Sequence, residues 1–189
     1  MRIVIITLIF LGMIFSAFAQ TKIILMVVSN VDFRDEELLV PKKIFEDAGY
    51  KVEIAAQEKG MARGILGAEL SVNLAIDKIQ TDNYEALVLV GGPGAQTYWD
   101  NVQLHSFAQS MYKQGKVIGA ICLAPVCLAN AGLLQNKKAT VWHSEAKRLT
   151  LRGAEYLSDD VVTDGRIITA SSPQSSERFA KKILEELKK

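Results

Sequence analysis

The feature that most constrains the fold is a short apolar run that passes directly into a helix-compatible run at Cys122. Val117–Ile121 has the composition of a buried strand, and the residues after Cys122 can continue as a helix with no turn residue between the two. This order predicts a strand-to-helix elbow, a sharp and often strained turn with Cys122 at its apex. We expect the N–H groups and dipole at the helix start to favour the Cys122 thiolate, with burial as a small apolar residue as the alternative.

The N-terminus has the pattern of a secretory signal peptide. Arg2 gives it a positive start, and residues 3–15 are almost entirely apolar. Ala17 and Ala19 then place small residues at alternate positions before the expected cleavage site. We therefore expect residues 1–19 to be removed and residues 20–189 to form one domain that is exported, either periplasmic or secreted. The apolar run is short for a spanning helix, so no stable membrane insertion is expected after cleavage. An uncleaved N-terminal membrane anchor is the alternative.

Charge and cysteine content exclude several classes of function. The chain has 22 Lys and Arg against 21 Asp and Glu, so no basic excess argues for nucleic acid as a partner. The two cysteines, Cys122 and Cys127, are separated by about 500° of helical rotation, so we expect no disulfide between them and place Cys127 in the core. Two histidines and two cysteines do not make a zinc site, and no metal is expected.

Strand and helix patterns alternate along the rest of the chain. Strands are predicted at 21–29, 51–56, 86–90, 117–121 and in a hairpin over 161–169. Helices are predicted over 35–48, over 103–114, after Cys122 and from 172 onward, and Asp35 can cap the first of them. Residues 65–72 can form a small excursion or hairpin. The alternation predicts a single-domain α/β three-layer sandwich with a mostly parallel sheet and helices on both faces.

Three features fall after the carboxyl ends of predicted strands, where sites lie in folds of this kind. They are the loop that leads to Glu37, the Gly91-Gly92 pair and Cys122. We expect the topology to bring them together.

The motifs around these residues resemble those of the ThiJ/PfpI superfamily, which includes PfpI-type proteases and the Parkinson-associated deglycase. The resemblance rests on Asp35–Pro41, Leu89–Gly94 and Ala120–Cys122 in this order, and it extends over nearly all of residues 21–189. It implies a flavodoxin-like fold shared with class I glutamine amidotransferases, a homodimer, and chemistry without an organic cofactor or metal.

The resemblance also implies a role for each motif. Cys122 would be the nucleophile, and Glu37 would share a proton with its sulfur; an ordinary first-turn helix acid is the alternative for Glu37. Gly91 and Gly92 would form part of an oxyanion hole whose donors are the N–H groups of Gly92 and Leu123, with a plain tight turn as the alternative.

His143 is the remaining candidate. It lies at the end of a predicted short strand, where deglycase-like members carry a histidine near the cysteine, and it would act as a general acid/base or hold a substrate. A purely structural role is equally open. Two departures from the family count against other chemistries: Leu123 stands where PfpI-type proteases carry a histidine, and His143-Ser144-Glu145 comes too early for an amidotransferase triad.

The leading hypothesis is a cysteine-dependent enzyme that acts on small reactive carbonyls or glycated groups, a glyoxalase- or deglycase-like hydro-lyase or hydrolase. One alternative is a PfpI-like cysteine peptidase with a peptide as substrate. Another is a non-enzymatic, redox-responsive or chaperone-like protein in which Cys122 is oxidised without turnover. A last alternative keeps the elbow for packing alone and predicts an unreactive Cys122.

Overall fold

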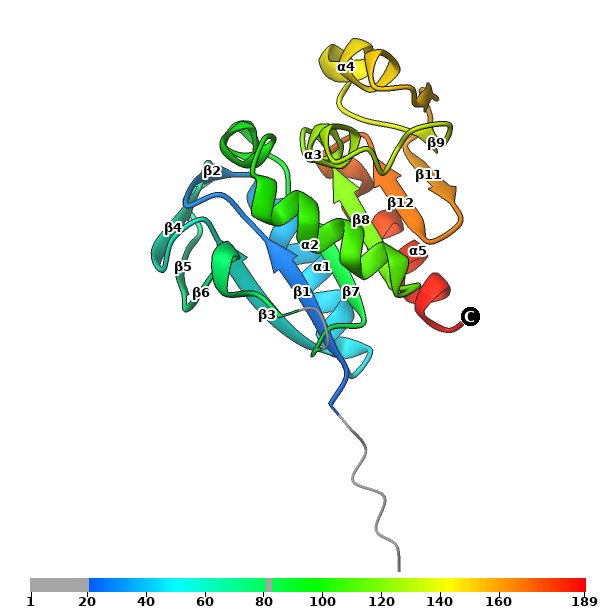
Figure 1. Ribbon diagram of the computed structural model, residues 1–189. Coiled ribbons are helices and arrows are strands. Elements are labelled where there is room, and N and C mark those ends of the chain that lie inside the picture. The colour runs from blue at the N-terminus through cyan, green and yellow to red at the C-terminus, as the bar shows by residue number, and fades with distance from the viewer. Residues whose placement is uncertain (1–20, 81–82) are drawn as a thin grey trace, which may run out of the picture.

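The computed structural model describes residues 21–80 and 83–189, which form an α/β sandwich around a seven-stranded sheet (Figure 1). The predicted signal peptide, residues 1–19, lies outside the described residues. The strand order is β11-β12-β8-β7-β1-β3-β6, and every neighbouring pair is parallel except β11 and β12. The strands are β1 (Ile23–Val27), β3 (Lys51–Ala56), β6 (Leu74–Ala75), β7 (Ala86–Leu89), β8 (Val117–Ile121), β11 (Val161–Asp164) and β12 (Ile167–Ala170). The expected fold class is confirmed.

Helices cover both faces of the sheet, which explains why the central strands are continuously apolar. On one face α1 (Asp35–Asp47) and α5 (Ser176–Leu187) pack on the sheet and on each other. On the other face lie α2 (Val102–Lys113) and α3 (Pro125–Asn130), and α4 (Ala146–Leu151) packs on α3 (Figure 1). Among the described residues no helix has the length and apolar character needed to cross a membrane.

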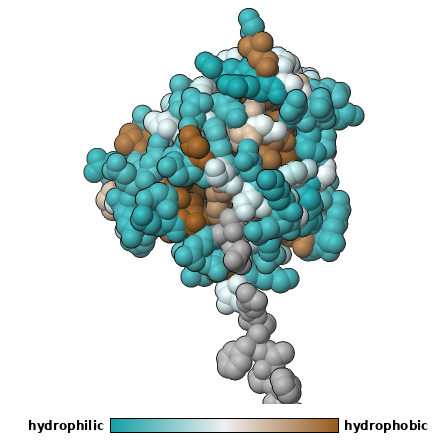
Figure 2. Space-filling view, in the orientation of Figure 1, coloured by the Kyte–Doolittle hydropathy of each residue, from teal (hydrophilic) through white to brown (hydrophobic). Residues whose placement is uncertain are grey.

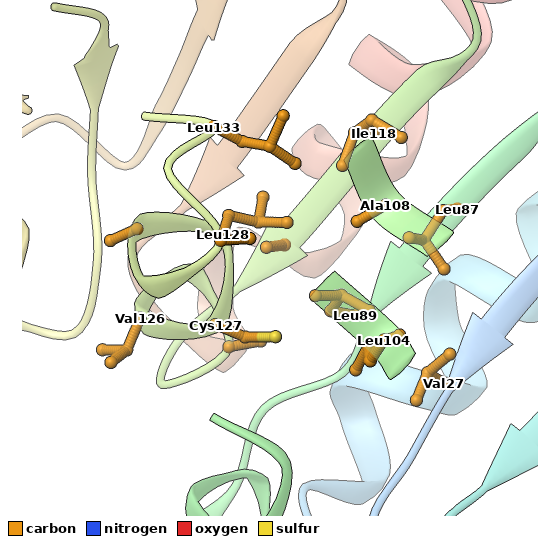
Figure 3. Close-up of a cluster of buried hydrophobic side chains, with 14 of the residues drawn as sticks. Val27, Leu87, Leu89, Leu104, Ala108, Ile118, Val126, Cys127, Leu128 and Leu133 are labelled. Carbon is orange, nitrogen blue, oxygen red and sulfur yellow. The ribbon is translucent and has the colours of Figure 1, made fainter. Parts of the chain in front are cut away.

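Alternate strand residues supply two hydrophobic cores, one on each side of the sheet. Figure 3 shows the core beneath α2 and α3, where Leu87 and Leu89 of β7 face Leu104 of α2. Cys127 belongs to this core and is fully buried, as expected, and both cysteines are free. The surface on the α2 side is mostly hydrophilic, with hydrophobic side chains in small separate groups (Figure 2).

A second, three-stranded sheet lies beside the carboxyl end of β1. It consists of β2 (Val31–Phe33), β4 (Gly60–Gly64) and β5 (Glu69–Val72). β4 and β5 form an antiparallel hairpin, so the excursion predicted around residues 65–72 is real, and β2 lies in a segment that the sequence had assigned to a loop. The remaining elements are β9 (Lys138–Ala139), β10 (Glu155–Tyr156), η1 (Ile76–Lys78), η3 (Pro93–Tyr98), η4 (His143–Glu145) and η5 (Pro173–Ser175).

Three local expectations are corrected by the structure. Asp35 does not cap α1: it is the first residue of the helix, and its carboxylate accepts hydrogen bonds from the loop between β4 and β5. The elbow is less abrupt than expected, because a turn over residues 122–124 separates β8 from α3, which begins at Pro125. His143 begins the 3-10 helix η4 and does not end a strand.

The order of the sheet fixes where a site can form. From β1 the chain continues to β3, toward one edge of the sheet, and from β7 it continues to β8, toward the other edge. β1 and β7 are adjacent. This reversal leaves a crevice beyond the carboxyl ends of β1 and β7, the usual ligand position in doubly wound sheets. Arg34, directly before α1, and Gly92, which follows β7, both line a pocket.

Candidate active site

Cys122 occupies a strained and nearly buried position directly after β8. Its φ is 59°, in the left-handed region that residues with a side chain rarely adopt, and 7% of the residue is exposed. Its N–H donates to the carbonyl of Ala170 (2.8 Å), and its own carbonyl accepts from the N–H of Trp142 (2.9 Å). Such a conformation costs about 1–3 kcal/mol and persists where surrounding bonds fix it, most often at functional sites.

Glu37 lies against Cys122 on the other side of Gly91. It sits in the first turn of α1 and is fully buried. A Cβ added to Gly91 would lie 2.5 Å from Glu37 Oε2 and 2.8 Å from the Cys122 Cβ, so both side chains flank this glycine. Within the described part of the chain neither carboxyl oxygen of Glu37 has a hydrogen-bond partner of normal geometry, although the Cys122 side chain and the Gly91 N–H both face it. An unpaired buried carboxyl is costly when charged, so this one holds its proton.

The electrostatics of the pair follow from this burial. Desolvation raises the pKa of Glu37 to about 8, against smaller lowering effects from Cys122 and Gly91. Burial and then the charge of Glu37 raise the pKa of the Cys122 thiol to about 12. The helix start was expected to favour the thiolate, but burial and the neighbouring carboxylate outweigh that effect here. Glu37 and Cys122 therefore form one unit that is mostly protonated at neutral pH and gives up its first proton near pH 8.

The backbone N–H groups expected to form an oxyanion hole both approach the sulfur. Those of Gly92 and Leu123 lower the pKa of the Cys122 thiol. Gly92 has a φ of 92°, and a Cβ on it would lie 2.6 Å from the Asp32 carbonyl oxygen, so the close approach of the two loops requires glycine. Two N–H donors beside one sulfur can also bind an oxygen that becomes negative when the sulfur attacks a carbonyl.

The sulfur opens into a pocket of about 250 Å³. Its walls are mostly apolar, and Arg34 is the one charged side chain among the described residues that line it. Arg34 is paired with Glu36 through two hydrogen bonds of 2.8 and 3.0 Å, which offsets its charge. The lining residues are Arg34, Ile65, Gly92, Pro93, Cys122, Leu123, Trp142 and Pro173.

His143 is close to the site in sequence but is not among the pocket-lining residues. Its neighbour Trp142 lines the pocket and bonds the Cys122 carbonyl, whereas the His143 side chain is exposed and its ring lies 5.0 Å from the Trp142 ring, centroid to centroid. The structure thus brings Cys122, Glu37, Gly91, Gly92 and Leu123 together. It leaves His143 at the edge, and a role for it stays a prediction.

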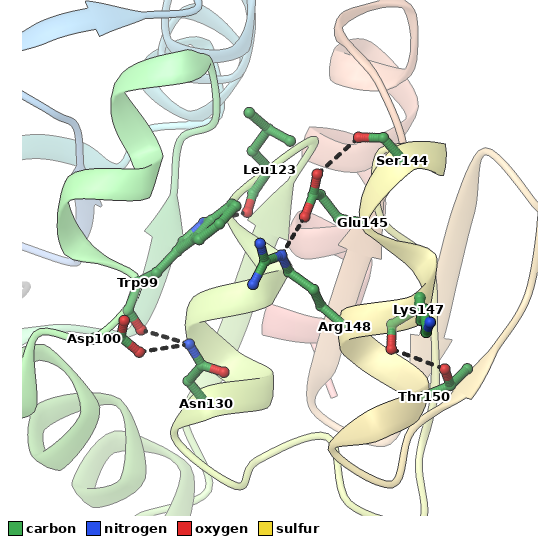
Figure 4. A network of polar contacts seen from close by, with 9 residues as sticks. All are labelled: Trp99, Asp100, Leu123, Asn130, Ser144, Glu145, Lys147, Arg148 and Thr150. Atoms are coloured by element: carbon green, nitrogen blue, oxygen red, sulfur yellow. Dashed lines mark hydrogen bonds and ion pairs between the residues drawn. The ribbon is translucent and has the colours of Figure 1, made fainter.

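A polar network that the sequence did not reveal holds the residue after the cysteine (Figure 4). The indole N–H of Trp99 donates to the carbonyl of Leu123 (2.8 Å), and the guanidinium of Arg148 lies over the Trp99 ring at 5.1 Å from its centroid. Arg148 in turn pairs with Glu145 (2.6 Å). Trp99 and Arg148 are remote in sequence and lie in no motif, so only the folded chain shows that they connect α4 to the elbow.

Comparison with known proteins places this geometry in a family. The profile of the DJ-1/PfpI family matches residues 22–186. An uncharacterized protein of Methanocaldococcus jannaschii is 43% identical over 88% of this chain and 82% of its own. A deglycase of Pyrococcus horikoshii is 30% identical over 83% of this chain and 95% of its own.

Other relatives carry different activity names on the same framework. A glutathione-independent glyoxalase of Caenorhabditis elegans is 26% identical over 89% of this chain and 90% of its own. A Bacillus subtilis protein with the provisional name of cysteine protease is 31% identical over 82% of this chain and 93% of its own. Among solved structures, a ThiJ/PfpI domain protein from Brachyspira murdochii superposes with a TM-score of 0.87 at 33% identity, covering 89% of this chain and 98% of that one. The chain belongs to the DJ-1/PfpI family.

Proposed function

We propose that this protein is a cysteine-dependent enzyme that converts small 2-oxoaldehydes into 2-hydroxy acids, with Cys122 as nucleophile and Glu37 as its proton-transfer partner. One observation carries the proposal: a buried carboxyl with no hydrogen-bond partner of normal geometry within the described residues faces a strained cysteine at the base of an apolar pocket. A carboxyl that only stabilised the fold would be expected to have bonding partners. The names of the deglycase and glyoxalase relatives support the same class of reaction.

The first step forms a bond between the Cys122 sulfur and the aldehyde carbon. Loss of the first proton of the Glu37–Cys122 pair leaves Glu37 as a carboxylate, which takes the thiol proton as the sulfur attacks, so the rate of this step rises with pH through about 8. The carbonyl electron pair moves to oxygen, where the N–H groups of Gly92 and Leu123 stabilise the negative charge until Glu37 transfers the thiol proton to it. The product of this step is a hemithioacetal, and Glu37 is again a carboxylate.

The second step moves a hydrogen between adjacent carbons. Glu37 as carboxylate takes the proton from the carbon bound to sulfur and gives it to the neighbouring ketone oxygen, which forms an enediol. Glu37 then takes the proton of the hydroxyl on the sulfur-bearing carbon and delivers it to the neighbouring carbon, which gives a thioester of a 2-hydroxy acid. Water adds to the thioester, the carbon–sulfur bond breaks, and the acid leaves with the thiol restored. The net change is the addition of one water molecule. In this scheme His143, one residue from the pocket wall, assists proton exchange with solvent.

The size and apolar lining of the pocket favour this reaction over the other activities named among relatives. A cavity of about 250 Å³ with five apolar lining residues suits a compact substituent better than a peptide or a sugar adduct with several hydroxyl groups, which would lose hydrogen bonds there. Leu123 beside the nucleophile also argues against the peptidase dyad of PfpI-type proteases.

A redox role is the second candidate. The oxygens of Glu37 face the sulfur and could hydrogen-bond a sulfenic or sulfinic group on it. In that case Cys122 would be oxidised by peroxide, and no carbonyl compound would be turned over.

The test is lactate formation from methylglyoxal by the purified protein, without added thiol. The proposal predicts steady turnover by the wild type, a loss of about 10³-fold or more in Cys122→Ser, and a large loss in Glu37→Gln with the fold intact by circular dichroism. Asp47→Asn, on the exposed end of α1, serves as the matched control and should keep full activity. Peroxide oxidation of Cys122 in a protein that forms no lactate would support the redox role instead.

A further inference from the structure

The loop over residues 64–68 brings one wall to the Cys122 pocket from a distant part of the sequence. It joins β4 to β5, and its residue Ile65 lines the pocket while remaining 37% exposed. The neighbouring Leu66 is 61% exposed. An apolar wall on a surface loop needs support from elsewhere, because a loop by itself is mobile.

That support comes from the backbone of the loop, whose five N–H groups all have acceptors. Three of them bond to main-chain oxygens: Gly64 to Ala68 (2.8 Å), Ile65 to Phe33 (3.0 Å) and Gly67 to Gly64 (3.2 Å). The other two donate to one side chain, since Leu66 bonds Asp35 Oδ2 at 2.8 Å and Ala68 bonds Asp35 Oδ1 at 2.7 Å. The Asp35 carboxylate is therefore the one side chain among the described residues that accepts hydrogen bonds from the backbone of this loop.

Asp35 is suited to this task by its burial and its surroundings. It is 5% exposed, and it lies two residues before Glu37 on the same helix. Gly64 lets the loop reach it, because a Cβ there would lie 2.5 Å from the Asp35 Cγ and 2.6 Å from its Oδ1. The two hydrogen bonds are charge-assisted and thus among the stronger ones in proteins.

We propose that Asp35 is a positioning residue that holds Ile65 in the pocket wall, and that Ile65 sets the size of the substituent that a carbonyl compound can carry to Cys122. This inference rests on the proposed function for its substrate, a 2-oxoaldehyde with a compact apolar group. The start of α1 then has three separate tasks: Arg34 lines the pocket, Asp35 fixes its wall, and Glu37 faces the sulfur.

The test measures the size selectivity of Cys122 with two neutral maleimides that share one reactive group, N-ethylmaleimide and N-benzylmaleimide. The ratio of their rate constants is read at Cys122 by peptide mass spectrometry, which separates it from Cys127. Ile65→Ala removes the wall, and Asp35→Asn replaces one acceptor of the loop with a donor. Asp47→Asn is the matched control, because it makes the same chemical change on the same helix at an exposed ion pair with Lys43.

Both Ile65→Ala and Asp35→Asn should raise the relative rate of the benzyl reagent by about tenfold, the lower end of the discrimination that one methylene provides in an apolar pocket. Asp47→Asn should leave the ratio unchanged. Hydrogen exchange at the amides of Leu66 and Ala68 should accelerate in Asp35→Asn but not in Ile65→Ala or Asp47→Asn. Where Asp35→Asn does not fold, Gly64→Ala displaces the loop from the same carboxylate and should change the ratio in the same direction.

The inference would be overturned by an unchanged maleimide ratio in Ile65→Ala. It would also be overturned by an unchanged ratio in folded Asp35→Asn or Gly64→Ala whose Leu66 amide exchanges faster than in the wild type. Turnover of methylglyoxal and phenylglyoxal by the same variants separates it from the proposed function. A shifted maleimide ratio in a protein that turns over neither aldehyde refutes the enzymatic proposal and leaves the role of Asp35 standing. If the aldehydes are turned over but neither the maleimide ratio nor the ratio of methylglyoxal to phenylglyoxal turnover changes in the variants, the role of Asp35 is refuted and the proposed function stands.

Discussion

The first turn of α1 contains two buried carboxyl groups, two residues apart, with opposite surroundings. Asp35 accepts two backbone N–H groups and fixes a loop. Glu37 is more deeply buried, and among the described residues it has no hydrogen-bond partner of normal geometry. The first arrangement stabilises structure, because breaking it leaves polar groups unpaired. In the second arrangement burial outweighs the effects that favour the charged form, which is consistent with a group that holds and releases a proton next to Cys122. The same chemical group in the same helical turn thus serves the fold in one case and the proposed chemistry in the other.

Removing each carboxyl should have unequal effects on stability. Asp35→Ala eliminates two charge-assisted hydrogen bonds and leaves two loop N–H groups without their acceptor, so we expect a loss of about 3 kcal/mol in the free energy of unfolding. Glu37→Gln removes no satisfied bond, and at pH 4.5, where the raised pKa of Glu37 costs the wild type little, it should change that free energy by less than about 1 kcal/mol. Urea denaturation of the two variants measures both values. Equal losses would show that Glu37 also has a structural role.

The two carboxyl groups should also differ in how they make the stability of the protein depend on pH. The pKa of Glu37 is raised from 4.5 to about 8 in the folded protein, so the folded state keeps a proton that the unfolded state has lost. The stability contributed by this proton is fully present below pH 4.5 and is lost as pH rises toward 8. Between these limits we expect stability to fall by about 1 kcal/mol per pH unit from this one group. Urea midpoints measured from pH 5 to 8 should show this slope in the wild type and a shallower slope in Glu37→Gln; identical slopes would refute the raised pKa.

A smaller effect is expected at Trp99, which supports the elbow from the side opposite Glu37. Trp99→Phe keeps an aromatic ring beneath Arg148 but removes the hydrogen bond to the Leu123 carbonyl. We expect a loss of about 1 kcal/mol in the free energy of unfolding, together with slower alkylation of Cys122 as the turn after it loosens. Arg148→Lys provides the control, because the indole bond to Leu123 is kept. A variant as stable and as reactive as the wild type would exclude Trp99 from the support of the site.

The sequence predicts the sheet well because buried parallel strands leave an unambiguous apolar signal. The runs at β1, β3, β7 and β8 were placed correctly, and the convergence of Glu37, Gly91-Gly92 and Cys122 followed from their positions after strand ends. What failed depended on tertiary contacts. Asp35 is a residue type that often caps helices, but here its carboxylate binds the N–H groups of the β4–β5 loop, a contact that only the folded chain creates.

The prediction that the Cys122 thiolate is favoured was wrong for a related reason. The helix start was expected to favour the thiolate, but a turn separates Cys122 from α3, and burial with the charge of Glu37 raises the thiol pKa instead. Burial is a property of the whole fold, and no local pattern reports it. The pocket walls at Ile65 and Trp142 were missed likewise, since neither residue lies in a motif.

The most direct test of the Glu37–Cys122 pair is the pH dependence of Cys122 alkylation by iodoacetamide in the wild type and in Glu37→Gln, read by mass spectrometry. We predict a wild-type rate that is low at pH 7 and rises with a midpoint at or above about 8, where the pair gives up its first proton. In Glu37→Gln the midpoint should move to higher pH, because no carboxylate is left to take the thiol proton while burial, the largest cause, still raises the thiol pKa. A wild-type rate already at its maximum near pH 6, or an identical midpoint in the variant, would contradict the account.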